Sequence, residues 1–409
     1  MANTFNLGNG NWAQKTEKLL AYNAENNNYK PLPFDFDRAS TATRVNKDGL
    51  IETLGIDEPR IDFLNNTKGH LLLEPSRQNK ITYSEDFSDS SWTKTRATII
   101  SNDTTSPDGS VNASKLSANT DNNTHEIAFS FSFTNNDFAF SVFAKKEELD
   151  KLTLFYTGVN KAATFDLTNG TTTSATFGTL PSKVEIEDYG SGWYRCSITD
   201  NTNGASQCRI RLGSGSGFVG NNTDGVYIYG AQLEEGSYAT SYIPTSGQSG
   251  GVTRSAETCN GAGNEQVINS IEGVLYAEIS ALADDGSARA ISLSDGTSIN
   301  QIVMRYYSTL NSVAVFIRVG GTFYANLDAT LTLTSFNKIA FKFKQNDFSL
   351  WINGTEVDTD TSGNTYTPNT LNQLSFDRGD AQDDFYGKVK DVRVYNTALT
   401  DAELIALTT

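Results

Sequence analysis

Hydrophobic and polar residues alternate along much of the chain with the period of two that is typical of β-strands with one buried face. Between residues 79 and 245 the alternation is clearest in segments 125–133, 137–145, 151–158, 193–198, 208–213 and 225–234. After residue 270 it recurs in segments 273–280, 288–295, 301–307, 312–319, 337–354 and 387–396. Clusters of Gly, Asn, Asp and Thr separate these segments, as turns separate the strands of a sandwich or jelly roll. The pattern predicts an all-β fold.

Interruptions of the alternation divide the chain into four predicted parts. Residues 1–78 form an extended N-terminal docking segment, and residues 79–245 form a first β-sandwich. Residues 246–270, rich in Gly and Ser at their start, are expected to be a linker. Residues 271–409 form a second β-sandwich. The predicted architecture is therefore two tandem β-sandwiches behind an N-terminal segment.

The N-terminal part has local signals of its own. Residues 12–22 predict a weakly helical stretch, and Asp48-Gly49 predicts the turn of a short β-hairpin. Residues 1–37 hold too few apolar side chains to build a core alone, so they must dock on something else. Two interpretations stay open: docking on another protein or a sister subunit, and packing on the next domain of the same chain.

Composition narrows the function classes. The 409 residues carry a formal net charge of −16, which argues against nucleic acid and anionic membrane surfaces as partners. No apolar stretch reaches the length of a transmembrane helix, and the N-terminus lacks the features of a secretory signal. We therefore expect synthesis in a cytoplasm and no membrane insertion. Among the three cysteines, Cys196 and Cys208 lie in strand-like runs that could be neighbours in one sheet, and we expect small buried thiols rather than a disulfide.

The sequence offers no catalytic constellation. Glu185 and Glu187 lie two positions apart on one strand face, but no aromatic or apolar surroundings indicate a shifted pKa. The run GSGSG at 213–217 has no following helix and is not a nucleophile elbow. Neither His70 nor His125 accompanies a Ser or Cys nucleophile pattern. We predict that the chain is not an enzyme.

An acidic loop near the C-terminus is a candidate metal site. Residues 377–384 place four carboxylates in one loop, enough oxygen ligands for part of a calcium shell: Asp377, Asp380, Asp383 and Asp384. The spacing is not that of an EF-hand. The interpretation that we favour is a solvated acidic turn between two strands, and calcium is the only cofactor that the sequence indicates.

Sugar binding would use exposed aromatic rings together with polar side chains that bind hydroxyl groups. The candidates in the last domain are Trp351, Tyr366, Arg378 and Tyr386. Trp351 lies between two apolar residues in an alternating strand, so we favour a core position for its ring. The sequence alone does not locate a ligand.

Several strings resemble bacteriophage tail-fibre and virion-surface proteins, in the order in which that family carries them. They are RASTATRVNKDGLIETLGIDEPRIDF at 38–63, LLLEPSRQNKITYSEDFSDSSW at 71–92, GWYRCSIT at 192–199, VYIYGAQLEEGSYATSYIPT at 226–245 and the TR at 253–254. The resemblance implies that residues 79–245 are a jelly roll of the carbohydrate-binding-module type. It also implies that residues 1–78 join this sandwich to the virus particle.

The C-terminal third resembles laminin-G and concanavalin-like lectin sandwiches. The matching strings are GVLYAEIS at 273–280, KIAFKFKQNDFSLWINGTEV at 338–357 and LSFDRGDAQDDFYGKVKDVRVYNTALTDAELIAL at 374–407. Within the last string, Thr400 and Glu403 have the spacing of a helix capping box, and Leu404 and Leu407 are placed to fix that helix to the sandwich. The match implies the fold more than the function, because this fold also hosts hydrolases and spacers.

The resemblances together predict a non-enzymatic structural protein on the surface of a tailed-phage virion, made in the host cytoplasm. The leading hypothesis is a tail-fibre or receptor-binding subunit, in a homotrimer, whose sandwiches adhere to host surface glycans. Its partners are then other virion proteins of the capsid, tail or baseplate, contacted through residues 1–78. The alternative is a capsid-decorating or head-fibre protein anchored by the same segment. A polysaccharide depolymerase is a distant alternative, since the Glu-x-Asp-x-x-Glu signature of lectin-fold glucanases is absent.

Overall fold

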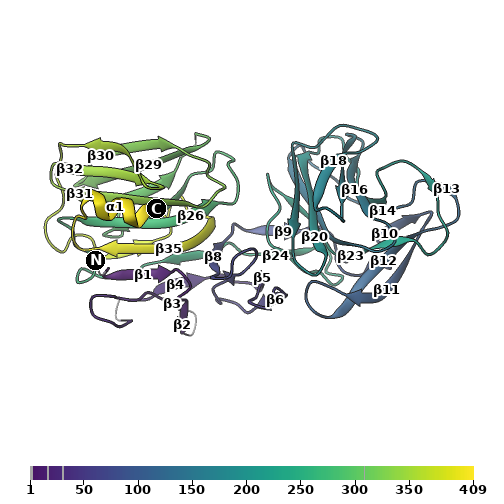
Figure 1. Ribbon diagram of the computed structural model, residues 1–409, viewed down its shortest axis with the longest axis horizontal. Coiled ribbons are helices and arrows are strands. Elements are labelled where there is room, and N and C mark those ends of the chain that lie inside the picture. Colours follow the sequence, from purple (N-terminus) through teal and green to yellow (C-terminus); the bar gives the residue numbers. More distant parts are fainter. Residues whose placement is uncertain (1–2, 16–17, 30–31, 308) are drawn as a thin grey trace. The chain divides into compact units, whose positions relative to one another are not determined.

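The computed structural model describes residues 3–15, 18–29, 32–307 and 309–409, and its regular structure is almost entirely β-strand (Figure 1). The predicted all-β fold with two β-sandwiches is confirmed. The chain forms two compact units, and each unit combines segments that are far apart in the sequence. The terminal unit consists of Met1–Ser40, Gly55–Pro75 and Ser255–Thr409, and the central unit of Thr41–Leu54 and Ser76–Arg254.

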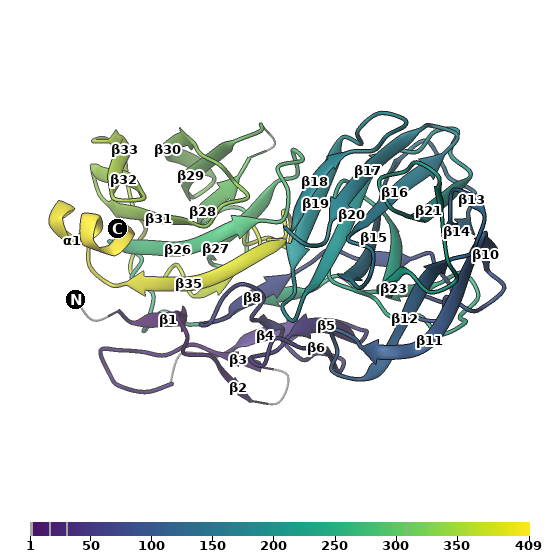
Figure 2. The ribbon, with the colours of Figure 1, turned by 45° about the vertical axis from the view of Figure 1, so that its right-hand side comes forward.

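Two antiparallel sheets form the sandwich of the terminal unit (Figure 2). Sheet I has the order β33 (Thr355–Asp360), β32 (Asp347–Ile352), β31 (Asn337–Lys344), β26 (Gly273–Ala281), β35 (Gly387–Tyr395), β8 (His70–Leu73) and β7 (Ile61–Asp62), with β1 (Phe5–Gly8) also paired with β35. Sheet II has the order β30 (Thr322–Thr330), β29 (Ser312–Val319), β28 (Gln301–Tyr306), β27 (Arg289–Ser294) and β34 (Gln373–Ser375).

The core of the terminal unit lies between these sheets because each strand alternates its side chains. From sheet II, Ile302, Met304 and Tyr306 enter the same buried cluster as Leu275 and Ala277 of sheet I. The intervening residues of β28 therefore point to the other face of sheet II. The candidate functional site lies on that outer face.

The N-terminal residues complete the terminal unit. Beside β1, the strands β2 (Ala13–Lys15), β3 (Lys18–Leu20), β4 (Phe34–Asp37) and β25 (Thr258–Asn260) form a small sheet. Phe5, Leu7, Leu19 and Phe34 are fully buried in the core cluster of the unit. The interpretation in which this segment packs on a domain of its own chain therefore describes the structure.

The prediction of a helix at residues 12–22 is wrong. In the described part of that range, β2 and β3 pair antiparallel, and Leu19 points into the core. Weak local helix propensity is overridden here by strand pairing and by burial of the apolar side chain.

The observed units also differ from the predicted division at residues 78 and 246–270. The expected linker contains β24 (Val252–Arg254), which pairs with β9 (Arg77–Asn79), and β25, which pairs with β4. The Gly and Ser content of this segment indicated a flexible linker. Instead, backbone hydrogen bonds to β9 and β4 hold residues 252–254 and 258–260 in regular strands.

The central unit is a second antiparallel sandwich. Sheet III has the order β10 (Trp92–Thr95), β14 (Glu126–Ser130), β21 (Gln207–Leu212), β16 (Lys151–Thr157), β17 (Lys161–Asp166) and β18 (Thr171–Ser174). Sheet IV has the order β11 (Ala97–Thr105), β12 (Val111–Ala118), β23 (Gly225–Glu235), β15 (Asp137–Lys146), β20 (Trp193–Asn201) and β19 (Lys183–Asp188). Short pairs join β13 (Asn122–Asn123) to β22 (Phe218–Val219), and β5 (Ala42–Val45) to β6 (Ile51–Leu54). The last pair confirms the hairpin predicted at Asp48-Gly49.

Buried residues of the central unit agree with the sequence except in one respect. Cys196 and Cys208 are free, buried thiols, as predicted, and Trp92 and Trp193 are buried in the same unit. However, Cys196 lies on sheet IV and Cys208 on sheet III, so they are not neighbours in one sheet. Among the described residues, no helix has the length and hydrophobicity needed to cross a membrane.

Several polar residues of the string YGAQLEEGSYATSYIPT make buried hydrogen bonds within the central unit. The Glu234 carboxylate accepts hydrogen bonds from the backbone N–H of Thr240 at 2.8 Å and from its hydroxyl at 2.6 Å. The Gln232 side chain accepts from the N–H of Ile243 at 2.7 Å, and the Asn79 amide donates to the Ile243 carbonyl at 2.9 Å. These contacts fix the segment after β23 against the sandwich, because buried polar groups must be paired.

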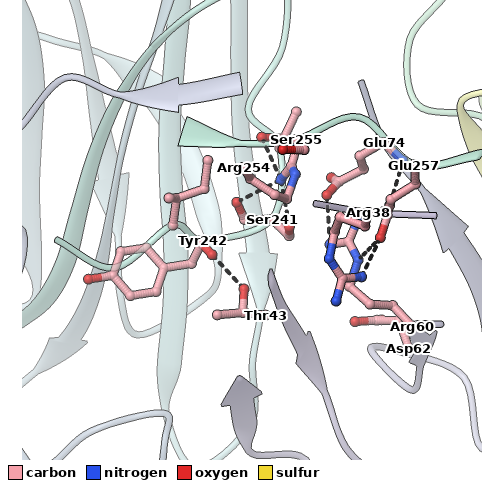
Figure 3. A network of polar contacts seen from close by, with 12 residues as sticks. Arg38, Thr43, Arg60, Asp62, Glu74, Ser241, Tyr242, Arg254, Ser255 and Glu257 are labelled. Atoms are coloured by element: carbon pink, nitrogen blue, oxygen red, sulfur yellow. Dashed lines mark hydrogen bonds and ion pairs between the residues drawn. The ribbon is translucent and has the colours of Figure 1, made fainter. Parts of the chain in front are cut away.

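A buried ion network holds distant segments of the terminal unit together (Figure 3). Glu257 accepts hydrogen bonds from Arg38 at 2.8 Å and from the Nε of Arg60 at 2.8 Å, and it also binds the Nη2 of Arg60. Arg60 contacts Glu74 at 2.8 Å. The side chains of Arg38, Arg60 and Glu257 have no exposed surface. The network balances two positive and two negative charges inside the protein, where an unpaired charge is costly.

We predict that Glu257→Gln destabilises the terminal unit by roughly 3–5 kcal/mol, since it leaves two buried guanidinium groups without their shared carboxylate. Calorimetric or denaturant unfolding of the full chain measures this as one transition moving to lower stability. Glu272→Gln is the matched control, because it removes an exposed ion pair with Lys344 and should leave both units unchanged. An equally small effect of both substitutions would contradict the role given to the network.

The His70 side chain is also buried in the terminal unit. Burial, followed by the charges of Lys388, Lys390 and Arg60, lowers the pKa of His70 to about 3. Neither ring nitrogen has a hydrogen-bond partner among the described residues, and the nearest Asp62 oxygen lies 3.7 Å from Nε2. The imidazole is therefore neutral in the folded protein across the physiological pH range.

The lowered pKa of His70 predicts an acid-dependent loss of stability. The unfolded chain takes up a proton below pH about 6.5 whereas the folded chain does not, so the contribution is complete above that pH and falls as pH decreases towards 3. The loss is about 1.4 kcal/mol for each pH unit below the unfolded pKa. Unfolding free energies measured between pH 7 and 4.5 should fall less steeply for His70→Gln than for the wild type, and parallel curves would contradict this.

Candidate functional site

A groove of about 850 Å³ opens on the outer face of sheet II in the terminal unit. Its floor comes from β28, β29 and β30, and Arg378 and Asp380 of the acidic loop form part of its wall. The groove residues of β28 and β29 alternate with the core residues of the same strands. One strand register therefore produces both the core and the groove.

The strand register arranges the floor in rows across the sheet. At the centre, Val303 of β28 lies opposite Phe316 of β29, and both pack with Ala290 in a small buried cluster. Towards one end of the groove, Gln301 lies opposite Arg318. Towards the other end, four residues on neighbouring strands lie opposite one another: Ala290, Arg305, Ala314 and Asp328. A buried apolar cluster thus lies between two polar ends, and of its members only Phe316 lines the groove.

Aromatic rings line both ends of the groove. Phe316 and Phe323 meet edge to face with ring centroids 5.3 Å apart, and Phe323 is 58% exposed. Tyr307 is 40% exposed, and the Arg305 guanidinium lies 4.5 Å from the centre of its ring. Such rings present flat apolar surfaces next to hydrogen-bonding groups, an arrangement that suits an amphipathic ligand.

The acidic loop positions two arginines on the groove wall. Arg378 donates two hydrogen bonds to Asp380, at 3.0 and 2.8 Å. Asp383 accepts a hydrogen bond from Arg305 at 3.1 Å and lies 3.6 Å from Arg378. The carboxylates of Asp380 and Asp383 therefore balance the charges of both arginines.

Two buried polar atoms of groove-lining residues have no hydrogen-bond partner among the described residues: Gln301 Oε1 and Arg305 Nε. Both residues lie on the outer face of sheet II, and Gln301 is only 2% exposed. A buried polar atom without a partner costs roughly 1–3 kcal/mol. A ligand that supplies the missing partners would recover part of this energy.

The structure places two of the predicted sugar-binding residues in the core and away from the groove. Trp351 packs in a buried cluster beneath α1 (Asp401–Thr408), on the side of sheet I away from sheet II, and Tyr366 lies in the main core. The core position favoured for Trp351 is confirmed, and neither ring can present its face to a ligand. The predicted capping box is also present, with Thr400 donating to Glu403 at 2.9 Å.

The other two candidates lie near the acidic loop. Arg378, one of the sugar-binding candidates, lines the groove. The Tyr386 hydroxyl donates to Asp384 at 3.1 Å, and Tyr386 is not among the groove residues.

The four aspartates do not converge on a calcium site. Asp380 and Asp383 bind arginines, Asp384 accepts from Tyr386, and Asp377 accepts from the backbone N–H of Gly379. Burial raises the pKa of Asp377 and of Asp384. In the described part of the chain, no group of three or more His, Cys, Asp or Glu is arranged to hold a metal ion.

The following residues of the groove were not among the candidates predicted from the sequence: Gln301, Arg305, Phe316, Arg318 and Phe323. The available signal was the alternation in residues 301–307 and 312–319, whose non-core positions carry polar and aromatic side chains. Which of these positions meet depends on the register between strands, and that register is not readable from either strand alone.

Comparison with known protein families matches one part of the chain. Residues 275–405 match the Laminin_G_3 model, described as the concanavalin A-like lectin/glucanases superfamily. The match lies within the terminal unit and includes sheet II. The C-terminal lectin-like sandwich expected from the sequence is therefore shown. No curated protein matches the chain at a significant level.

Several solved structures are similar to part of the chain. The Ruminococcus gnavus IT-sialidase CBM40 is 19% identical, with 37% of this chain and 94% of that chain covered and a TM-score of 0.31. Domain 4 of the Geobacillus stearothermophilus arabinanase AbnA, in complex with arabinotriose, is 12% identical, with 38% and 73% covered and a TM-score of 0.32. A Limulus polyphemus SAP-like pentraxin is 11% identical, with 35% and 71% covered and a TM-score of 0.29. At such low identities and TM-scores, nothing about a ligand follows from them.

We predict that calcium does not stabilise the terminal unit, because Asp380 and Asp383 are already engaged by arginines. Unfolding midpoints of the full chain should agree in millimolar calcium and in EGTA. A higher midpoint in calcium that disappears in Asp383→Asn would instead make the acidic loop a metal site.

Proposed function

We propose that the chain is a non-catalytic, glycan-binding subunit on the surface of a tailed-phage particle. The observation that carries the glycan-binding part is the groove on sheet II, with its exposed aromatic rings and its polar, partly unpartnered ends. The phage part is supported by the strings at 38–63, 71–92 and 192–245, which resemble virion-surface proteins.

The groove chemistry favours a carbohydrate. A sugar ring has apolar faces and a rim of hydroxyl groups, so it suits a groove in which the exposed rings of Phe323 and Tyr307 lie beside hydrogen-bonding side chains. Gln301 and Arg305 lie four residues apart on one strand face, about 13 Å at ~3.3 Å per residue. This separation exceeds one sugar ring and suits a short oligosaccharide.

The arrangement of carboxylates supports binding without catalysis. Glycoside hydrolysis needs a pair of carboxyl groups flanking the bond to be cleaved, one of them free to donate a proton. In the groove, Asp380 is held by two hydrogen bonds from Arg378, and Asp328 is exposed on β30. Neither carboxylate lies buried among apolar side chains, as the general acid of a glycosidase does.

The leading form of the proposal is a tail-fibre or receptor-binding subunit, which acts in a homotrimer and contacts host surface glycans. Weak contacts then suffice, because repeated presentation on a particle raises avidity by ~10²–10⁴. The alternative form is a capsid-decorating or head-fibre protein. In either form, the N-terminal residues contact other virion proteins from their place on the terminal unit.

We predict that Phe323→Ala weakens glycan binding by about 1 kcal/mol, about fivefold, because it removes an exposed ring at the end of the groove. A glycan array probed with the full chain identifies the ligand, and calorimetric titration then compares the variants. Ile405→Ala is the control, since it truncates a comparably exposed side chain on α1. Equal binding by both variants would move the site away from this groove.

Electron microscopy of labelled phage particles separates the two forms of the virion proposal. Label at the tail tip or baseplate supports a receptor-binding subunit, and label on the head supports a decoration protein. Purified particles that lack the chain altogether would overturn the virion part while leaving the glycan-binding part intact.

A further inference from the structure

We infer that the groove selects an acidic sugar and that Arg318 holds the oxyanion of that sugar. The inference rests on the proposed glycan binding and specifies the ligand class of the same groove. It follows from the distribution of charge among the three arginines that line the groove: Arg305, Arg318 and Arg378.

Two of these arginines already have carboxylate partners. Arg305 pairs with Asp383, and Arg378 pairs with Asp380 and Asp383. At that end of the groove the two arginines face three carboxylates, those of Asp380, Asp383 and Asp328, so a ligand meets no excess of positive charge there.

Arg318 has no carboxylate within ion-pair distance among the described residues. Its Nε donates to the backbone carbonyl of Gly321 at 3.0 Å, and its guanidinium lies 5.1 Å from the centre of the Phe323 ring. The groove carboxylate of Asp328 lies opposite Ala314, four residues along β29 and therefore about 13 Å away. Arg318 is thus a half-buried positive charge that the protein leaves without a counterion.

The surroundings of Arg318 suit a sugar that carries an anionic group. A guanidinium binds an oxyanion through two parallel hydrogen bonds, and partial burial strengthens them. Gln301 lies directly across from Arg318 and has an unpartnered amide oxygen, which can accept from a hydroxyl or amide of the same sugar. Phe316 and Phe323 supply apolar surface beside both groups. The anion, the hydroxyl and the ring face each have a partner at one end of the groove.

The test uses matched oligosaccharides of one backbone, in carboxylated, sulfated and neutral carboxyl-reduced forms, titrated into the full chain. We expect the wild type to bind an acidic form about tenfold more tightly than the neutral form, the size of one charge-assisted hydrogen bond. In Arg318→Gln the ratio of these affinities should fall towards one, and Arg318→Lys, which keeps the charge but not the planar fork, should lie between. The preference in the wild type should also decrease as salt is raised.

Comparison of the carboxylated and sulfated forms tells which oxyanion Arg318 prefers, and either preference supports the inference. Equal binding of acidic and neutral forms, or a preference that survives in Arg318→Gln, overturns it and leaves glycan binding itself intact. If the wild-type chain binds none of these forms although its unfolding transitions show that it is folded, the inference and the proposed function are both overturned.

Discussion

The buried network of Arg38, Arg60, Glu74 and Glu257 is the constraint on which the terminal unit depends. Its members come from three segments, which the two parts of the central unit separate in the sequence. A buried charge is tolerated only with its partner, so the segments must come together for any of them to fold stably. The network thereby holds the N-terminal strands and β25 to the sandwich that carries the groove, and explains why the strings at 38–63 and 71–92 contain these charged residues.

The groove lies in the same unit, and the register of its strands determines which residues line it. The core-facing residues of β28 and β29 fix how sheet II packs on sheet I, and the residues between them necessarily form the outer face. That face combines Val303 and Phe316 with hydrogen-bonding neighbours and an uncompensated Arg318. Stability and recognition therefore use alternate positions of the same strands, and the acidic loop contributes by holding two arginines at the wall.

Much of the fold could be predicted from the sequence, and most of the site could not. The alternating segments, the capping box at Thr400 and the buried Trp351 are set by local pattern, and the structure agrees with them. The helix predicted at residues 12–22 is wrong because strand pairing overrides their weak helix propensity. The groove was missed because Gln301 and Arg318 meet only through the β28–β29 register, a relation between strands rather than within one. Calcium remained a candidate beside the favoured solvated turn because one of the two arginines that bind the loop, Arg305, lies 78 residues away in the sequence.

A crystal structure of the full chain with an acidic oligosaccharide that it binds would test the central claim most directly. Our account predicts sugar density against the Phe323 ring in the groove of sheet II, with the anionic group against Arg318. Sugar density confined to the central unit, or to another face of the terminal unit, would contradict the assignment of this groove as the binding site.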